Sequence, residues 1–443
     1  MKIFLLLSAI PYDRGEAIDV VSYEAVRLMA EAGHTVYVQA LIREPRSPRE
    51  MERQRYAAER LASAGTVHLL DPIYLGDFVK PPAGIAAHAV ALLRSLPGLR
   101  NAINPYFFPA VAARPAVEAR VRQTEADVIA SIWSWEALAA SYDIPGVPKF
   151  VYYGNPNHKP IEAQLAYPDL FELPSGGLVS RMKLAGLRLL NRAREIQHVR
   201  MMAACEVTSN NALIDAQYYR DQGHPRSLYL QNMWPDAPVE PVFGGHPAEE
   251  VPRICGSVGN LAATGNTFGL YYLGAELVPR LEAQLGRGGF VVDVYGGGKA
   301  RHRVAEKLSH PSIRLRGWVD DLNAEIMSSA VFLVLTNVYG FNVGNTRILL
   351  AWSLGSCVVA HRSSALSMPE LVHDETALLG DTPEEIAELV ARAVRDRALR
   401  ERIGRGGYRA FQQYYRSETL VPRMLAEIEG LVPTSHGGAL QPC

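Results

Sequence analysis

The sequence predicts an α/β protein with two Rossmann-like, doubly wound domains that face each other across a cleft. Two observations carry this prediction. Apolar strands alternate with helical segments in two separate series, and a stretch rich in Pro and Gly without periodicity divides the series. The 443 residues also exceed one ordinary hydrophobic core. We therefore expect ligands at the carboxyl ends of the strands, in the cleft.

Composition narrows the classes of function. Apolar residues make up 48% and charged residues 21%, and the net charge of −1 gives no overall attraction to nucleic acid, so no nucleic-acid partner is expected. The four cysteines lie far apart and form no CxxC pair, which indicates neither a zinc site nor disulfides and favours a cytoplasmic location. The apolar start leads into a βαβ unit and is not interpreted as a secretory signal.

The first domain is predicted over residues 1–231. Its opening strand, helix and strand (2–10, 17–32 and 35–41) form a βαβ unit, and a charged helical segment follows. The later strands are short apolar runs. They are expected near 127–131, 149–153, 206–209 and 227–230.

Two segments of the first domain leave alternatives open. The apolar stretch 85–113 reads either as helices bordering an acceptor groove or as ordinary packing helices. The segment 181–200 alternates basic and apolar residues in a helical pattern. It predicts either a solvated helix face or a peripheral contact with the inner face of a membrane.

The loop 154–160 is a candidate for chemistry because it is polar, turns sharply and follows a predicted strand. Its His158 has a side chain that can act as a general acid, as a general base or in positioning an acceptor. The alternative is a loop histidine without a function.

The second domain is predicted over 254–406, after a linker at 232–253. It contains a new series of strands and helices, with a triple glycine at 296–298. A C-terminal helix at 407–431 is expected to pack back toward the first domain, and a polar tail covers 432–443. The expected strands lie at 254–258, 290–295, 313–315, 331–335 and 358–359.

The glycine-rich loop 340–344 predicts an anion site. It follows an apolar strand and precedes Asn345 and Thr346, expected to cap a helix that begins near Arg347 and stops at Gly355 in a left-handed conformation. Free N–H groups and the positive helix end favour a phosphate there. Arg347 in the first turn opposes the helix dipole unless an anion lies beside it; the alternative is an Arg pointing into solvent.

The order of these elements resembles the retaining glycosyltransferases of family 4 over nearly the whole chain. The motifs that carry the resemblance are AEAGHTVYV at 30–38, VDVYGGGKARHRVAEKL at 292–308 and IRLRGWVDDL at 313–322. The resemblance implies the two-domain GT-B fold. It also implies a nucleotide-diphosphate sugar as co-substrate in the second domain, without a further cofactor or a metal.

The family resemblance implies a position in this sequence for each part of the donor. It places the base against Gly317, Trp318 and Val319. It places the diphosphate at Gly344, Asn345 and Thr346, and the sugar near Gly340, Phe341 and Asn342. The remaining donor-binding positions that we predict are Gly259, Asn260, Gly297 and Lys299.

Several positions depart from the family pattern. The paired glutamates of the family fall on Asn342 and Leu350, and its early Arg and Lys fall on Asn260 and Thr264. Its first-domain catalytic histidine falls close to Gly154, which leaves His158 as a substitute. The basic residues that can replace the missing phosphate ligands are Arg347, Lys299 and Arg301.

The leading hypothesis is a hexosyltransferase-like enzyme that moves a sugar from a nucleotide-diphosphate donor to a hydroxyl acceptor, with retention of configuration. The acceptor is a glycan, a lipid-linked sugar or a small molecule, and the predicted catalytic residues are His158, Asn342 and Arg347. Because of the missing glutamates, a catalytically silent scaffold or glycan-binding subunit is the alternative. A sugar-nucleotide epimerase ranks last, since its acid and base residues cannot be placed.

Overall fold

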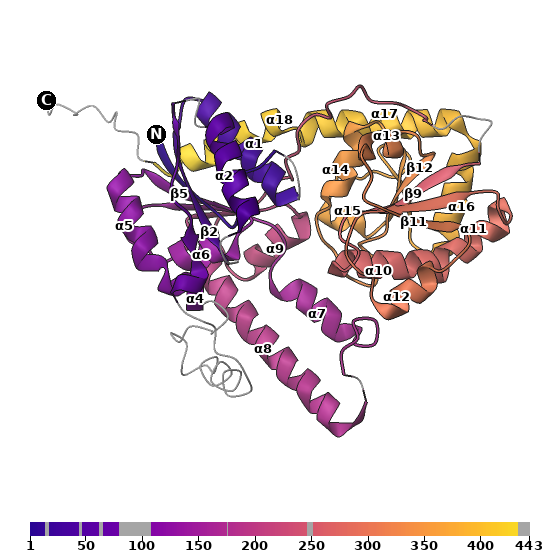
Figure 1. Cartoon of the computed structure of the whole chain (residues 1–443), viewed down its shortest axis with the longest axis horizontal. Coiled ribbons are helices and arrows are strands. Elements are labelled where there is room, and N and C mark those ends of the chain that lie inside the picture. The colour runs from indigo at the N-terminus through magenta and orange to yellow at the C-terminus, as the bar shows by residue number, and fades with distance from the viewer. Residues whose placement is uncertain are drawn as a thin grey trace, which may run out of the picture.

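The computed structural model describes residues 1–13, 17–43, 47–61, 65–78, 108–174, 176–245 and 251–432. Two α/β domains lie side by side, each built around one parallel sheet, and the C-terminal helices run across both (Figure 1). The predicted fold class of two Rossmann-like domains is confirmed.

The first sheet has the order β3-β2-β1-β5-β6-β7-β8, all parallel, and β4 also pairs with β2. Its central strand β1 is buried from Ile3 to Leu7, as a strand covered on both faces requires. The order reverses at β1, which opens a crevice at the carboxyl ends. The strands are β1 Lys2–Leu7, β2 Thr35–Ile42, β3 Val67–Leu69, β4 Ile73–Tyr74, β5 Val128–Ile132, β6 Lys149–Tyr153, β7 Val207–Asn210 and β8 Ser227–Tyr229.

Helices cover both faces of the first sheet. The charged segment after β2 is helical, as predicted, over α2. Of the apolar stretch 85–113, only α4 and Ala113 belong to the described part, and the remainder lies outside it. The helices are α1 Ala17–Glu31, α2 Pro48–Leu61, α4 Phe108–Ala112, α5 Arg114–Thr124, α6 Trp135–Ser141, α7 His158–Ala166, α8 Gly177–Ala203 and α9 Leu213–Asp221.

The second sheet has the order β11-β10-β9-β12-β13-β14 and is also parallel. The helix expected after its first strand contains a π-helical turn at Leu273–Leu277 between α10 and α11. The strands are β9 Arg253–Val258, β10 Val291–Tyr295, β11 Ile313–Gly317, β12 Val331–Val334, β13 Val358–His361 and β14 Leu378–Gly380. The helices are α10 Thr264–Tyr272, α11 Val278–Leu285, α12 His302–Leu308, α13 Leu322–Met327, α14 Thr346–Ser353, α15 Ser364–Ser367 and α16 Pro383–Arg395.

The C-terminal segment, expected as one helix over 407–431, forms two, α17 Arg397–Tyr414 and α18 Ser417–Glu429. Trp234 of the linker causes the break, because its N–H donates to Tyr415 O at 2.9 Å and its carbonyl accepts from Ser417 N at 3.0 Å. Helix α18 packs against α1, and its buried residues join the core of the first domain. These buried apolar residues are Leu420, Val421, Met424, Leu425 and Ile428.

A segment of the first half of the chain also enters the second domain. Leu170 and Phe171, in the turn after α7, belong to the core of the second domain. The Phe171 ring meets the Phe268 ring edge-on at 5.1 Å between centroids, and the carboxylate of Glu172 accepts from the N–H of His302. This turn therefore joins the two domains on the side of α7 (Figure 1).

Candidate active site

Two glycine loops interlock at the carboxyl edge of the second sheet. Gly259 follows β9 and has φ +103°, and Gly296 follows β10 with φ +119°. A Cβ at Gly296 would lie 2.1 Å from the Gly259 carbonyl oxygen, so no side chain fits there. The N–H of Leu261 donates to Gly297 O at 2.9 Å. The predicted donor-binding residues Gly259, Asn260 and Gly297 are thus brought together, with backbone that a ligand can approach closely.

Arg347 lies directly beside these loops. It occupies the first turn of α14, and a Cβ on Gly259 would lie 3.6 Å from its Nη2. Burial lowers the pKa of its guanidinium to about 10, which leaves it charged at neutral pH. Within the described part of the chain, no carboxylate forms an ion pair with it. A cation that is partly buried and lacks an acidic partner is unfavourable until an anion binds.

The N-terminus of α14 adds uncapped N–H groups to the same place. Asn345 stands at the N-cap, as expected, but its side chain does not cap the helix. It donates instead to Thr336 Oγ1 at 2.5 Å and to Asn337 Oδ1 at 2.9 Å. The first-turn N–H groups, including that of Thr346, are left without this side-chain acceptor and suit an anion.

The loop 340–344 lies against the first domain. A Cβ on Gly344 would lie 3.0 Å from Asn211 Oδ1 and 3.2 Å from Asn232 Nδ2, so glycine permits this close approach. Lys159 of α7 donates to the carbonyl of Asn342 at 2.8 Å and also pairs with Asp215 of α9. The Oδ1 atom of Asn342 is buried and has no hydrogen-bond partner among the described residues. This acceptor is available to a sugar hydroxyl.

His158 faces away from this loop. Its imidazole is buried, with Nε2 3.9 Å from Glu195 Oε1 and its ring centroid 5.4 Å from that of Tyr218. These partners lie on α8 and α9, and burial lowers the pKa of His158. The structure therefore does not bring His158 together with Asn342 and Arg347. The next residue, Lys159, takes that place, since adjacent helical residues point in different directions.

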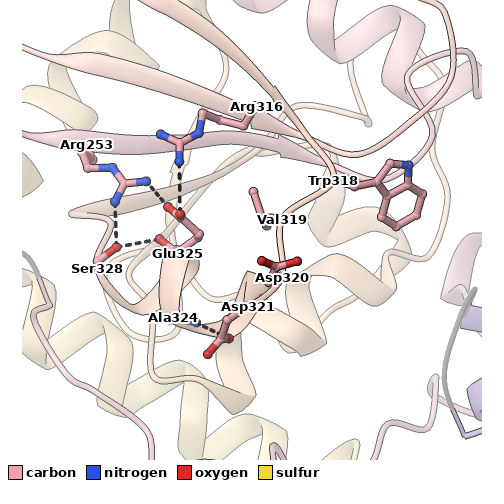
Figure 2. Close-up of a pocket in the computed structure, with 9 residues that line it drawn as sticks. All are labelled: Arg253, Arg316, Trp318, Val319, Asp320, Asp321, Ala324, Glu325 and Ser328. Atoms are coloured by element: carbon pink, nitrogen blue, oxygen red, sulfur yellow. Dashed lines mark hydrogen bonds and ion pairs between the residues drawn. The ribbon is translucent and has the colours of Figure 1, made fainter.

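The residues predicted to contact the base lie at the end of β11. Gly317 has φ +66°, and Trp318 is 85% exposed, with its indole against Gly297. Trp318 and Val319 line an open pocket of about 610 Å³ (Figure 2). The cations there are paired. Arg316 donates to Glu325 at 3.3 Å, and Arg253 donates to Asp293 at 2.9 Å. Because carboxylates already neutralise these two arginines, the pocket is a poorer site for a phosphate than the surroundings of Arg347.

The other two basic residues proposed as phosphate ligands, Arg301 and Lys299, are less suitably placed than Arg347. The guanidinium of Arg301 donates to Phe171 O at 3.2 Å and lies 4.9 Å from the centre of its ring, so it holds the turn after α7. Lys299 is exposed. At the positions of the missing Arg and Lys, Asn260 Oδ1 accepts from Ala262 N, and Thr264 Oγ1 accepts from Gln164.

The remaining predicted positions contribute to packing, to the loop backbone or to helix capping. Phe341 is buried against Phe268, and Gly340 has φ +80°. Leu350, where the family has a glutamate, packs against the core. Asp321, the second acidic residue of the motif at 313–322, accepts from Ala324 N and caps α13.

Sequence reasoning assigned the first-domain contribution to His158 and missed Lys159, Asn211 and Asn232. Lys159 lies on α7 and the two asparagines lie in separate loops, and only the folded chain brings them to the glycine loop. The one signal in the sequence that could have indicated the two asparagines is that each follows a strand. Asn211 follows β7 and Asn232 follows β8, at the carboxyl edge where ligands bind in such sheets.

No cluster of three or more His, Cys, Asp or Glu side chains able to hold a metal occurs among the described residues. Nor does any helix in the described ranges have the length and apolarity needed to cross a bilayer.

Glu136 gives a pH-dependent prediction. It lies in the first turn of α6, and burial raises its pKa from 4.5 to about 7. The folded chain therefore holds a proton that the unfolded chain releases, so its stabilising contribution is complete below pH 4.5 and is lost as the pH rises through 7. Glu136→Gln should remove this dependence. Urea unfolding at pH 5 and pH 8 should show a smaller loss of stability in the variant than in the parent; equal losses would contradict the assignment.

The family relationship is decided by the second domain. Residues 252–396 match the family model described as Glycosyl transferases group 1. The second domain thus resembles the group 1 glycosyl transferases. The glycosyltransferase assignment is thereby confirmed at the level of the family, and the family covers the loops, Arg347 and the base-side residues described above.

Solved glycosyltransferase structures share the whole two-domain fold. Sucrose-phosphate synthase from Thermosynechococcus elongatus matches over 97% of this chain and 99% of its own at 14% identity and a TM-score of 0.64. The UDP-forming α,α-trehalose-phosphate synthase from Burkholderia vietnamiensis matches over 97% of each chain at 14% identity and a TM-score of 0.58. Anabaena HepE in complex with UDP and glucose covers 96% of this chain and 99% of its own at 12% identity and a TM-score of 0.54. The search of curated proteins finds no match. These structures establish the GT-B fold of this chain.

Proposed function

We propose that this glycosyltransferase transfers a sugar from a nucleoside-diphosphate donor to a hydroxyl acceptor, with retention of configuration. The observation that carries the proposal is Arg347, a partly buried cation with no acidic partner in the described chain, beside a glycine loop and an uncapped helix N-terminus. Such a place suits the diphosphate of a donor, because the diphosphate supplies the negative charge that Arg347 has no partner for.

The proposed chemistry follows from where charge develops. When the bond between the sugar carbon and the phosphate oxygen breaks, its electron pair goes to the leaving diphosphate, the acceptor oxygen bonds to the sugar carbon, and the acceptor's hydroxyl proton passes to a diphosphate oxygen. Arg347 and the N–H groups of α14 stabilise that charge in place, without a metal. Asn342 would bind a sugar hydroxyl through its unpartnered Oδ1. The acceptor would enter from the first domain, where Asn211 and Asn232 approach the same loop.

Nucleotide binding tests this proposal directly. A ligand that binds only the folded chain stabilises it by about 2.7 kcal/mol at a concentration 100 times its Kd. We expect one of UDP, GDP and ADP to raise the melting temperature clearly, and UDP is tried first because HepE was solved with it. If none of the three raises it, the silent-scaffold alternative is favoured and the donor site is abandoned.

A panel of nucleotide sugars then identifies the donor. Hydrolysis or transfer with one sugar nucleotide, measured by release of the nucleoside diphosphate, supports the proposal. Retention is checked by the anomeric configuration of the product; an inverted product would overturn that part alone.

A further inference from the structure

Helix α8 carries an exposed apolar stripe. It is formed by Leu178, Met182, Leu189 and Ile196, spaced four, seven and seven residues apart, so the four side chains follow one line along the helix. Leu178 is 74%, Met182 66% and Leu189 52% exposed. The buried residues Leu184, Asn191, His198 and Met202 face the opposite way, and Ala193 and Met201 are buried only where the C-terminal half of α8 is covered more widely. From Leu178 to Leu189 the apolar stripe therefore points out of the protein.

The stripe lies on a projecting part of the molecule. The N-terminal end of α8 extends beyond both domains (Figure 1). Between Gly177 and Leu189 only Leu184 is buried. An apolar line in water is unfavourable, so its presence on a projecting helix indicates a partner.

The charges beside the stripe identify the class of partner. Residues 177–194 contain five basic residues and no Asp or Glu. Arg181, Arg188 and Arg192 line one edge of the stripe, and Lys183 and Arg194 lie farther round the helix. An apolar stripe beside a basic edge, on a segment without acids, is typical of helices that lie in the surface of an anionic bilayer, with the apolar side chains among the acyl chains and the cations at the headgroups.

We infer that α8 docks this glycosyltransferase on an anionic phospholipid membrane. The helix lies in the interface and does not cross the bilayer, since no helix in the described ranges is long and apolar enough to span it. A second copy of the chain is a less suitable occupant. In a two-fold pairing through the stripe, Arg181 and Arg188 of both copies would come together, and residues 177–194 supply no acid to neutralise them. The inference does not depend on the identity of the sugar donor.

Flotation with lipid vesicles tests the inference. The full chain should float with vesicles of phosphatidylcholine and phosphatidylglycerol, bind phosphatidylcholine alone weakly, and dissociate as salt rises. Met182→Asp with Leu189→Asp should weaken binding at least tenfold. The matched control is Met51→Asp, because Met51 is also an exposed methionine (54%) on a helix of the first domain, α2, but lies outside the stripe. It should bind as the parent does.

A charge variant separates the two contributions. Each basic side chain near an anionic surface strengthens binding about fivefold, so Arg181→Glu with Lys183→Glu should weaken binding more than tenfold and remove the salt dependence. Circular dichroism checks that each variant is folded. The inference is overturned if the parent stays in the soluble fraction at low salt, if the stripe variant floats like the control, or if sedimentation shows a dimer that only the stripe variant disrupts and that does not bind vesicles.

Discussion

Arg347→Ala is expected to lower kcat/KM for the nucleotide sugar by about 10² to 10³-fold, the loss typical of removing one preorganised donor to a developing anion. The guanidinium lies beside Gly259, at the α14 N-terminus. Its removal would leave backbone N–H groups as the main ligands of the diphosphate. The increase of melting temperature on adding the nucleotide should disappear as well.

The stability of the same variant without ligand gives a second readout. Because Arg347 is partly buried without an acidic partner in the described chain, its removal should leave the ligand-free protein as stable as the parent or more stable. Arg314→Ala, an exposed arginine on β11, is the control and should change neither activity nor nucleotide binding. Unchanged kcat/KM in a folded Arg347→Ala protein would remove the residue from the mechanism.

Lys159→Met is expected to destabilise the protein by about 3 kcal/mol, the loss typical of removing one partner of a buried ion pair. Lys159 pairs with Asp215, whose side chain is fully buried, and also donates to the carbonyl of Asn342. Without the lysine, a buried carboxylate has lost its cation, and the two domains have lost one contact. The shift of the urea midpoint measures the effect.

The pH dependence and a double variant distinguish charge from packing. Burial raises the pKa of Asp215 to about 6, although Lys159 opposes the shift. Its contribution to stability is therefore greatest below 3.8 and is lost as the pH rises through 6, so the defect of Lys159→Met should be largest above pH 6. Asp215→Asn added to Lys159→Met should recover part of the stability. A defect that neither pH nor the second substitution changes would contradict the role of charge.

The order of elements could be predicted because it depends on local pattern. The apolar run of β1 predicted a strand buried on both faces. Gly355 predicted a left-handed residue at the end of α14, and its φ is +76°. The break between α17 and α18 could not be predicted. It depends on Trp234, a residue far away in the sequence that pairs with the backbone at Arg416.

The second-domain half of the candidate site was likewise predictable, and the first-domain half was not. Glycines, a helix start and Arg347 lie close together in sequence, so their chemistry is visible there. The directions in which the His158 and Lys159 side chains point depend on how α7 packs against α8 and α9. No local sequence pattern predicts this packing. Leu170 and Phe171 were also missed, since a short apolar turn does not show which domain will bury it.

The crossing of α18 to the first domain has a consequence for how this chain is made. Its apolar residues complete a core whose other members precede residue 234. During synthesis, the first domain therefore leaves the ribosome with a hydrophobic surface beside α1 that stays uncovered until the last helix emerges. A chain that stops before Ser417 would keep this surface exposed and would be a substrate for chaperones and proteases.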